Sequence, residues 1–334
     1  MNGAGARKVV VVTGASAGVG RATARAFGRR GDAVALIARE EERLRIAAEE
    51  IEAAGGRALT CPLDVSDADA VAAAVDRIER ELGPIDVWVN SAMSAVLGFV
   101  HETSAADFRR VTEVTYLGYV NGTLAALARM RARDRGVIVM VGSALAYRAI
   151  PLQASYCAAK HAIRGFADAL RVELEHERSA VRVTTVHLPG LNTPQFGWVK
   201  TTLRRHPQPV PPIYQPEIAA DAIVHASEHP RREYFVGGST VMTILGNRLA
   251  PRIADRYLAS TNVDAQQTDD PIPPDRPNYL YAPLPGDPGA HGRFDAQAKG
   301  RSPTWWATKR RARIAPAVLA AAAAGAMSLG RRRR

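Results

Sequence analysis

The opening of the chain constrains its fold more than any other segment. An apolar, β-branched run at residues 8–12 leads into Thr13-Gly14-Ala15-Ser16-Ala17-Gly18-Val19-Gly20, and a helical segment follows at residues 21–30. Short β-branched apolar runs are typical of buried parallel strands. The three glycines permit a tight turn and let backbone N–H groups approach a pyrophosphate at the amino end of the helix. One glycine-rich turn is a weak indication, so its interpretation depends on the rest of the chain.

Strand and helix signals then alternate for over 200 residues, which is typical of βαβ units. The pattern predicts an α/β fold, a doubly wound parallel sheet (Rossmann fold) with about seven strands flanked by helices. The expected later strands lie at residues 33–38, 57–63, 85–90, 137–141, 181–188 and 233–236. The expected later helices lie at residues 41–54, 67–82, 107–131 and 153–176.

The composition changes after this region, so we divide the chain into three parts. Residues 1–250 form the expected catalytic domain. Residues 251–304 form an extension, with a helix at 251–260 and an irregular or disordered stretch, rich in Pro, Asp and Gly, at 264–303. Residues 305–334 form a basic, Ala-rich tail.

A serine, a tyrosine and a lysine indicate acid–base chemistry. Ser143 ends an apolar strand-like run, and Tyr156 follows thirteen residues later, four residues before Lys160. Residues four apart share one face of a helix. An ammonium near a phenol lowers the phenol's pKa from its ordinary value of about 10. Such a tyrosine exchanges a proton with an alcohol or carbonyl oxygen, as hydride transfer requires.

Six motifs in this order and spacing resemble the short-chain dehydrogenase/reductase family, of the single-domain type, over roughly residues 7 to 240. They are Thr13-Gly14-x-x-x-Gly18-x-Gly20, Asp64, Asn90, Ser143, Tyr156-x-x-x-Lys160 and Pro189-Gly190. The resemblance implies that Tyr156 is the acid or base, that Lys160 lowers its pKa and bonds the nicotinamide ribose, and that Ser143 holds the substrate oxygen. It also implies a set of cofactor-binding residues: Thr13, Gly14, Ser16, Gly18, Val19, Gly20, Asp64, Val65, Asn90, Ala92, Tyr156, Lys160, Pro189, Gly190 and Thr193.

The end of the second strand bears on the choice of cofactor. An acid there binds the ribose diol of NAD, whereas an arginine accommodates a 2′-phosphate. Ala38 stands at the position of the acid and Arg39 follows it, so we expect NADP(H) rather than NAD(H). Glu40 complicates this expectation, although an acid in a first helical turn also complements the helix dipole. No metal is expected.

Two positions depart from the family pattern. Thr115 stands where the family usually carries an asparagine that helps hold a proton-relaying water, so Thr115 is a further catalytic candidate with an altered relay. Met93 replaces a glycine after the fourth strand and either narrows the substrate mouth or fills the core. These departures leave a scaffold or sensor that binds NADP(H) with little turnover as an alternative, but the intact Ser143, Tyr156 and Lys160 favour an enzyme.

The resemblance implies that a long connection at residues 189–216 forms a lid over the substrate, and loops of this length tend to be functional. The side chains expected to face the substrate are mostly apolar, which indicates a lipophilic ketone or secondary alcohol. They are Val96, Leu97, Leu145, Tyr147, Leu191, Phe196 and Trp198.

The charge distribution argues against a nucleic-acid partner. The net charge is +11, but ten basic residues and no acidic one lie from residue 299 onward, so residues 1–298 carry only +1.

Cys61 and Cys157 are expected to be buried and reduced. The first strand begins by residue 9 and leaves no room for a signal peptide, so we expect a cytoplasmic protein.

The tail has two interpretations that the sequence leaves open. Trp305-Trp306 and a basic cluster precede an uncharged stretch at residues 314–330, and four arginines follow. One interpretation is peripheral contact with an anionic membrane surface, with the tryptophans at the interface. The other is a helix packed on the domain or on a partner. The resemblance also implies a homo-oligomer formed through the long helices.

Overall fold

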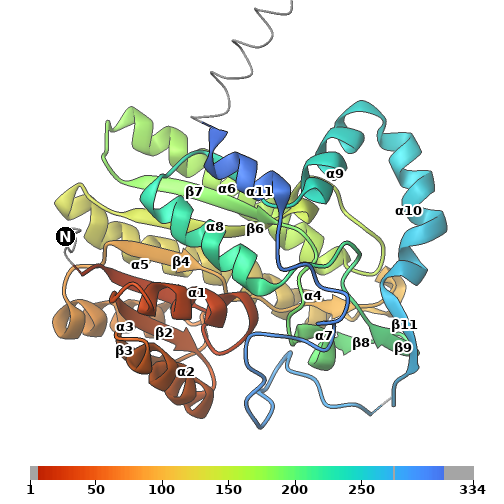
Figure 1. Cartoon of the computed structure of the whole chain (residues 1–334), viewed down its shortest axis with the longest axis horizontal. Coiled ribbons are helices and arrows are strands. Elements are labelled where there is room, and N and C mark those ends of the chain that lie inside the picture. Colours follow the sequence, from red (N-terminus) through yellow and green to blue (C-terminus); the bar gives the residue numbers. More distant parts are fainter. Residues whose placement is uncertain (1–6, 274, 312–334) are drawn as a thin grey trace, which may run out of the picture.

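A parallel sheet of seven strands forms the centre of the computed structural model, which describes residues 7–273 and 275–311 (Figure 1). The strand order is β10-β7-β6-β4-β1-β2-β3, and each neighbouring pair is parallel. The predicted α/β Rossmann fold is therefore confirmed. The strands are β1 (Val9–Thr13), β2 (Ala33–Ala38), β3 (Arg57–Pro62), β4 (Val87–Asn90), β6 (Val137–Ser143), β7 (Arg182–Leu188) and β10 (Glu233–Phe235).

Helices cover both faces of the sheet because the central strands are apolar on both sides. Val10 and Val12 of β1 pack on one face against α1 (Gly18–Gly28), α2 (Glu41–Ala53) and α8 (Pro216–Glu228). Val9 and Val11 pack on the other face against α3 (Ala68–Leu82), α5 (Gly118–Arg133) and α6 (Ala154–His176). Alternation of side chains along a strand places neighbouring valines on opposite faces.

The long helix predicted at residues 107–131 is present and contains a π turn. It consists of α4 (Ala105–Thr112), a π-helical turn η2 (Glu113–Leu117) and α5. The extra residue of a π turn alters the facing of the side chains around it. Thr115 points inward within this turn and hydrogen-bonds the backbone of Ser94. The π turn was not predicted, because helical periodicity does not reveal this tertiary contact.

Two small sheets and several short helices surround the carboxyl edge of the main sheet. β5 (Val96–Leu97) pairs with β8 (Lys200–Thr201), and β9 (Arg205–Pro207) pairs with β11 (Gln267–Pro271). The connection after β7 also contains α7 (Gln195–Trp198). The remaining short elements are η1 (Val100–Glu102) and η3 (Ala144–Ala146).

The C-terminal extension packs on the domain. It follows α9 (Gly238–Leu249) and begins in α10 (Pro251–Ala265), so the predicted helix at 251–260 is confirmed and is longer. The following chain is largely irregular, as predicted, but it is not disordered over its described part: β11 is paired, and Leu280, Ala290 and Phe294 are buried. In Figure 1 this chain crosses one end of the molecule before α11 (Pro303–Lys309) returns beside α8. The three-part division of the chain stays a prediction.

The two tail tryptophans have different environments. Trp305 is 4% exposed, and its Nε1 donates to Asp221 Oδ2 of α8 at 2.6 Å. Its ring also lies edge-on to His225 and Tyr234. Of the two interpretations of the tail, Trp305 fits packing on the domain, because α8 buries it, whereas Trp306 is 53% exposed. No helix in residues 7–273 or 275–311 has the length and apolar character to cross a bilayer. The uncharged stretch at 314–330 lies outside the described residues.

Replacing Trp305 with alanine tests whether α11 stabilises the domain. Removing a large buried aromatic side chain is expected to lower the free energy of unfolding by about 3–5 kcal/mol. The control is Trp306→Ala, which is expected to change it by less than about 0.5 kcal/mol because the side chain is exposed. Urea unfolding curves measure both values, and equal effects of the two substitutions would contradict the observed packing.

Candidate active site

A cavity of about 870 Å³ opens at the carboxyl edge of the main sheet. The chain proceeds outward from β1 through β2 and β3, and then crosses to β4 on the other side of β1. Ligands of doubly wound sheets bind outside the carboxyl ends of the strands at such a reversal. The cavity is bordered by the glycine-rich turn after β1, the ends of β2, β6 and β7, and helices α9 and α10.

The glycine-rich turn fits a bound phosphate group. Gly14 has a φ of +69°, and a Cβ atom there would lie 2.7 Å from Ala92 Cα. A Cβ atom at Gly20 would lie 2.1 Å from Gly14 O. Glycine is therefore required for the close approach of this turn to the segment after β4. Helix α1 has no side-chain cap and no acid in its first turn, which leaves its positive amino end suited to an anion.

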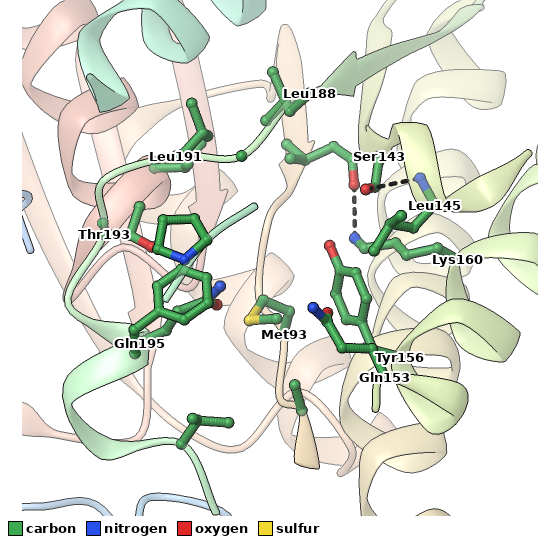
Figure 2. Close-up of a pocket in the computed structure, with 18 of the residues that line it drawn as sticks. Met93, Ser143, Leu145, Gln153, Tyr156, Lys160, Leu188, Leu191, Thr193 and Gln195 are labelled. Carbon is green, nitrogen blue, oxygen red and sulfur yellow. Dashed lines mark hydrogen bonds between the residues drawn. The ribbon is translucent and has the colours of Figure 1, made fainter. Parts of the chain in front are cut away.

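Ser143 and Tyr156 meet inside the cavity. Ser143 ends β6 and Tyr156 lies in the first turns of α6, and Figure 2 shows the Tyr156 phenol pointing toward Ser143 and Lys160. Ser143 Oγ accepts a hydrogen bond from Leu145 N at 3.1 Å. Burial raises the pKa of Tyr156, and hydrogen bonding with Ser143 opposes that rise.

Lys160 is 2% exposed and has partners other than Tyr156. Its Nζ donates to Val141 O at 2.8 Å and to Tyr119 Oη at 3.1 Å. Nζ also lies 5.5 Å from the centre of the Tyr156 ring. Burial lowers the pKa of Lys160 to about 7. The predicted lowering of the Tyr156 pKa is thus corrected: burial raises it, and Lys160 Nζ bonds Val141 O and Tyr119 Oη rather than the Tyr156 phenol.

Tyr119 was missed by the sequence analysis. It is 1% exposed, and its hydroxyl donates to Val141 O at 3.0 Å while it accepts from Lys160. The sequence does contain a signal for Tyr119. Tyr119 lies four residues after Thr115 on the same predicted helix, and residues four apart share one face of a helix.

Thr115, Thr13 and Asn90 lie outside the cavity lining. Thr115 Oγ1 accepts from Ser94 N and donates to Ser94 O, both at 2.9 Å. Thr13 Oγ1 accepts from the backbone N–H groups of residues 91 and 92. Asn90 is fully buried, and its amide bonds Thr123 and Trp88. In this structure their polar atoms bond backbone or core groups, and the predicted roles of these residues at the cofactor or substrate stay predictions.

The remaining predicted cofactor residues all line the cavity. They are Gly14, Ser16, Gly18, Val19, Gly20, Arg39, Asp64, Val65, Ala92, Tyr156, Lys160, Pro189, Gly190 and Thr193. The Asp64 carboxylate already accepts from Ser66 N and Oγ and pairs with Arg110, which lowers its pKa against the effect of burial. Whether each of these residues contacts the cofactor stays a prediction.

The substrate-facing side chains are partly as expected. Leu97, Leu145, Leu191, Phe196 and Trp198 line the cavity, and so does Met93. Val96 packs instead against Val111 and Leu280. Tyr147 turns away and donates to Glu233 Oε1 at 2.5 Å. The sequence analysis missed the lining residues of α9, α10 and the extension, including Met242, Asn247, Ile253, Tyr257, Asn262 and Tyr279.

Comparison with known proteins agrees with this geometry. The family model for short chain dehydrogenases matches residues 8–202. The chain belongs to the short-chain dehydrogenase/reductase family. The uncharacterized oxidoreductase YxnA of Bacillus subtilis is 32% identical over 322 residues, covering 95% of this chain and 88% of the relative. An uncharacterized oxidoreductase of Mycobacterium tuberculosis is 33% identical and covers 77% of this chain and 74% of the relative.

Two solved structures of the family share the fold. An alcohol dehydrogenase from the archaeon Thermococcus sibiricus, complexed with 5-hydroxy-NADP, is 28% identical with a TM-score of 0.60, and the match covers 69% of this chain and 95% of that one. A metagenomic short-chain oxidoreductase in complex with NADP is 29% identical with a TM-score of 0.57, and the match covers 69% and 96%. This family member is therefore a dehydrogenase or reductase with all three predicted acid–base side chains at its cavity.

Replacing Lys160 with methionine tests the cost of burying its ammonium group. The folded pKa of about 7 lies below the unfolded value of about 10.4, so the unfolded chain binds one more proton between these pH values. We therefore expect the free energy of unfolding of the parent protein, minus that of Lys160→Met, to rise with pH between these two values. Its slope approaches about 1.4 kcal/mol per pH unit. Urea unfolding without added nucleotide, at several pH values, measures this difference.

The matched control is Lys8→Met, because Lys8 is partly exposed at the start of β1. We expect no comparable pH dependence for that variant. A difference between the parent protein and Lys160→Met that is flat or falls as the pH rises would show that Lys160 stays protonated in the folded protein.

Proposed function

We propose that this protein is an NADP-dependent oxidoreductase that moves a hydride between the nicotinamide and the carbon of a ketone or secondary alcohol. The observation that carries the proposal is the meeting of Ser143, Tyr156 and Lys160 in the cavity that the glycine-rich turn borders. The scaffold alternative is not favoured, because these three side chains are present and share one site. The departures at Thr115 and Met93 leave them in place.

NADP(H), when bound, supplies or accepts the hydride. In the reducing direction Tyr156 Oη donates its proton to the substrate oxygen as the carbonyl becomes an alcohol, and the reverse direction returns that proton to Tyr156. Tyr156 is protonated at neutral pH, so its Oη carries the proton that ketone reduction requires. Ser143 Oγ accepts from Leu145 N, so its own O–H is free to donate to the substrate oxygen.

The polar groups at the other end of the cavity support NADP(H) over NAD(H). The amino end of α1 suits the pyrophosphate, and Arg39 at the end of β2 suits a 2′-phosphate. Ala38, at the position where an acid would bind the ribose diol of NAD, offers no competing carboxylate. The NADP complexes of the two solved relatives give the same indication.

The substrate end of the cavity favours a lipophilic molecule. Leu145, Ile150, Val199, Met242 and Ile253 contribute apolar surface. Polar side chains also line the cavity, among them Arg148, Gln153 and Asn247. Apolar walls with placed polar groups are typical of sites that bind a substrate by burying hydrocarbon and orient it by hydrogen bonds.

We also propose an oligomeric state and a cellular location for the protein. Leu117, Leu124 and Val172 are exposed apolar residues on the helical layer of α5 and α6, which is the expected contact of a homo-oligomer. A cytoplasmic location is supported by two free, buried cysteines. Peripheral membrane contact by the tail loses the support of Trp305, and no nucleic-acid partner is proposed.

Replacing Tyr156 with phenylalanine is expected to lower kcat for ketone reduction by about 10²–10⁴-fold, because the proton donor is lost. Binding of NADPH, followed by its fluorescence, is expected to persist. The control is Tyr234→Phe, whose buried hydroxyl bonds His229 O outside the cavity. Full turnover by Tyr156→Phe on a genuine substrate would rule out the proposed chemistry.

A series of methyl ketones of increasing chain length tests the apolar cavity. Each buried methylene contributes about 0.8 kcal/mol, so kcat/KM is expected to rise about four-fold per methylene until the chain fills the site. Steady-state rates of NADPH oxidation measure the trend. A profile that is flat or decreases from the shortest ketone would contradict a lipophilic substrate.

A further inference from the structure

Helices α9 and α10 carry an apolar surface that the rest of the described chain leaves uncovered. Thirteen large apolar residues are exposed in the structure, and six of them lie on these two helices. We call these six residues the apolar patch: Val241, Met242, Leu245, Leu249, Ile253 and Tyr257. Single exposed apolar residues are ordinary, whereas a cluster of them is typical of an interaction site.

The patch follows the periodicity of the two helices. Met242, Leu245 and Leu249 succeed one another at intervals of three and four residues on α9, and Ile253 and Tyr257 lie four apart on α10. These intervals place side chains on one face of a helix. The two helices contact each other and stand at the edge of the molecule, away from the main sheet (Figure 1). The patch is therefore an outward face of a helical pair.

Part of the patch borders the mouth of the cavity. Met242, Ile253 and Tyr257 line the cavity, yet they are 69%, 68% and 64% exposed. Side chains that meet both the cavity and the solvent lie at the opening of the cavity. An apolar ligand that enters here therefore passes apolar side chains on its way from the surface to Tyr156.

Arginines alternate with the patch along the chain. An arginine directly precedes an exposed apolar residue at three positions spaced four apart, in Arg248-Leu249, Arg252-Ile253 and Arg256-Tyr257. Neighbouring residues of a helix point about 100° apart, so the three arginines flank the apolar face instead of sharing it. All three arginines are exposed.

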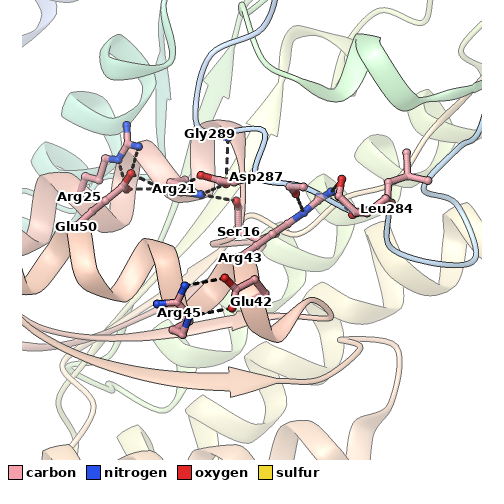
Figure 3. Close-up of polar contacts among 12 residues, drawn as sticks. Ser16, Arg21, Arg25, Glu42, Arg43, Arg45, Glu50, Leu284, Asp287 and Gly289 are labelled. Atoms are coloured by element: carbon pink, nitrogen blue, oxygen red, sulfur yellow. Dashed lines mark hydrogen bonds and ion pairs between the residues drawn. The ribbon is translucent and has the colours of Figure 1, made fainter.

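The three arginines beside the patch have no carboxylate partner within residues 7–273 and 275–311. The acids of α10 are paired elsewhere, because Asp255 pairs with Arg148 and Asp264 pairs with Arg205. Helix α9 contains no acid. In contrast, the exposed Arg45 of α2 pairs with Glu42 (Figure 3). The patch therefore lies beside three positive charges that no acid of the described chain pairs with.

The charge of this surface selects what can cover it. The chain beyond residue 311 carries five arginines and no acid, so it would bring like charge to the three arginines. A second copy on this face would bring a second set of the same arginines and would close the mouth of the cavity. Like charges repel at short range. The surface of an anionic membrane instead offers negative headgroups to arginines and hydrocarbon to apolar side chains.

We propose that α9 and α10 dock on an anionic membrane, with the apolar patch among the outer parts of the acyl chains and the three arginines at the lipid headgroups. Interfacial helices with an apolar face and flanking basic residues lie in the plane of the membrane surface. The mouth of the cavity then faces lipid, in which a lipophilic ketone or alcohol is concentrated. Docking goes beyond the proposed hydride transfer, whereas entry of the substrate from the lipid rests on that proposal.

Binding of the full chain to vesicles tests the docking without any turnover. The vesicles are phosphatidylcholine alone and phosphatidylcholine with about 30% phosphatidylserine, and sedimentation measures the bound fraction. The parent protein is expected to prefer the anionic vesicles. Leu245→Gln combined with Leu249→Gln is expected to weaken binding by about ten-fold or more, because two apolar side chains no longer enter the lipid. Leu245→Met combined with Leu249→Met keeps the apolar area and is expected to retain binding.

A second pair of variants tests the arginines. Arg252→Gln combined with Arg256→Gln is expected to weaken binding to the anionic vesicles by about ten-fold or more, since one arginine near such a surface contributes about five-fold. The control is Arg45→Gln combined with Arg77→Gln, which removes the same charge from exposed positions of α2 and α3. This control is expected to retain most of the binding.

A label locates the docking surface on the protein. Cys61 and Cys157 are buried, so a polarity-sensitive thiol label on Leu249→Cys reports on that position. Lipids that carry nitroxide groups are expected to quench this label and to leave a label on Glu49→Cys of α2 unquenched. Equal quenching at both positions would overturn the proposal.

Three further results would also overturn it. One is the absence of binding of the parent protein to the anionic vesicles. Another is binding that both double Gln variants of α9 and α10 retain but that replacement of the four final arginines, residues 331–334, with Gln abolishes, which assigns the binding to the tail. The third is self-association of the parent protein that Leu245→Gln with Leu249→Gln abolishes, which makes this face an interface between copies.

Entry of the substrate from the lipid has its own readout. For a long-chain methyl ketone supplied in anionic vesicles, kcat/KM is expected to fall about ten-fold in Leu245→Gln with Leu249→Gln, in line with the loss of vesicle binding. For a short, water-soluble methyl ketone it is expected to stay unchanged, because neither leucine lines the cavity. An equal fall for both ketones would overturn entry from the lipid. If the parent protein turns over neither ketone, the hydride-transfer proposal fails, while the vesicle measurements still decide the docking.

Discussion

The short segment after β4, residues 91–95, is held by side chains from three distant parts of the chain. Thr13 accepts from its first two N–H groups, Thr115 bonds both backbone groups of Ser94, and Tyr279 accepts from Ala95 N. These bonds satisfy backbone groups that leave the sheet where β4 ends. The segment lies close to the glycine-rich turn, because a Cβ atom on Gly14 would meet Ala92 Cα at 2.7 Å. All five residues of the segment line the cavity, so these bonds position one of its walls.

Burial governs the electrostatics of the acid–base groups. Lys160 enters the core beneath the cavity, where the carbonyl of Val141 and the phenol of Tyr119 accept its hydrogen bonds. Loss of solvent lowers the pKa of Lys160 and raises that of Tyr156, so both groups shift toward their neutral forms. The proton on Tyr156 is thus available for transfer at neutral pH. Arg39 and Arg43 at the nucleotide end illustrate the opposite situation, in which buried groups keep their charge and are held by neutral carbonyl oxygens.

The extension adds a wall to the cavity of the domain. Helix α10 of the extension, together with α9 of the domain, covers the substrate end of the cavity, and residues 279–283 line its nucleotide end. The anchors of residues 276–289 are mostly arginines that donate to backbone carbonyl groups, so this stretch needs no regular secondary structure to be ordered. This arrangement explains how a stretch rich in proline, aspartate and glycine packs against the domain.

The sequence by itself determined the sheet and the bounds of most strands and helices, and it pointed to Ser143, Tyr156 and Lys160, which share one cavity. Periodicity and local motifs indicate each of these features over a few neighbouring residues. It did not reveal the π turn around Thr115, the inward direction of Asn90, or the contact between Tyr119 and Lys160. Trp305 bonds Asp221 of α8, which lies 84 positions earlier in the chain. Arg39 bonds the backbone carbonyl of Tyr279, which lies 240 positions later. Only the tertiary structure decided these features, because a hydrogen bond between distant segments leaves no periodic pattern in either one.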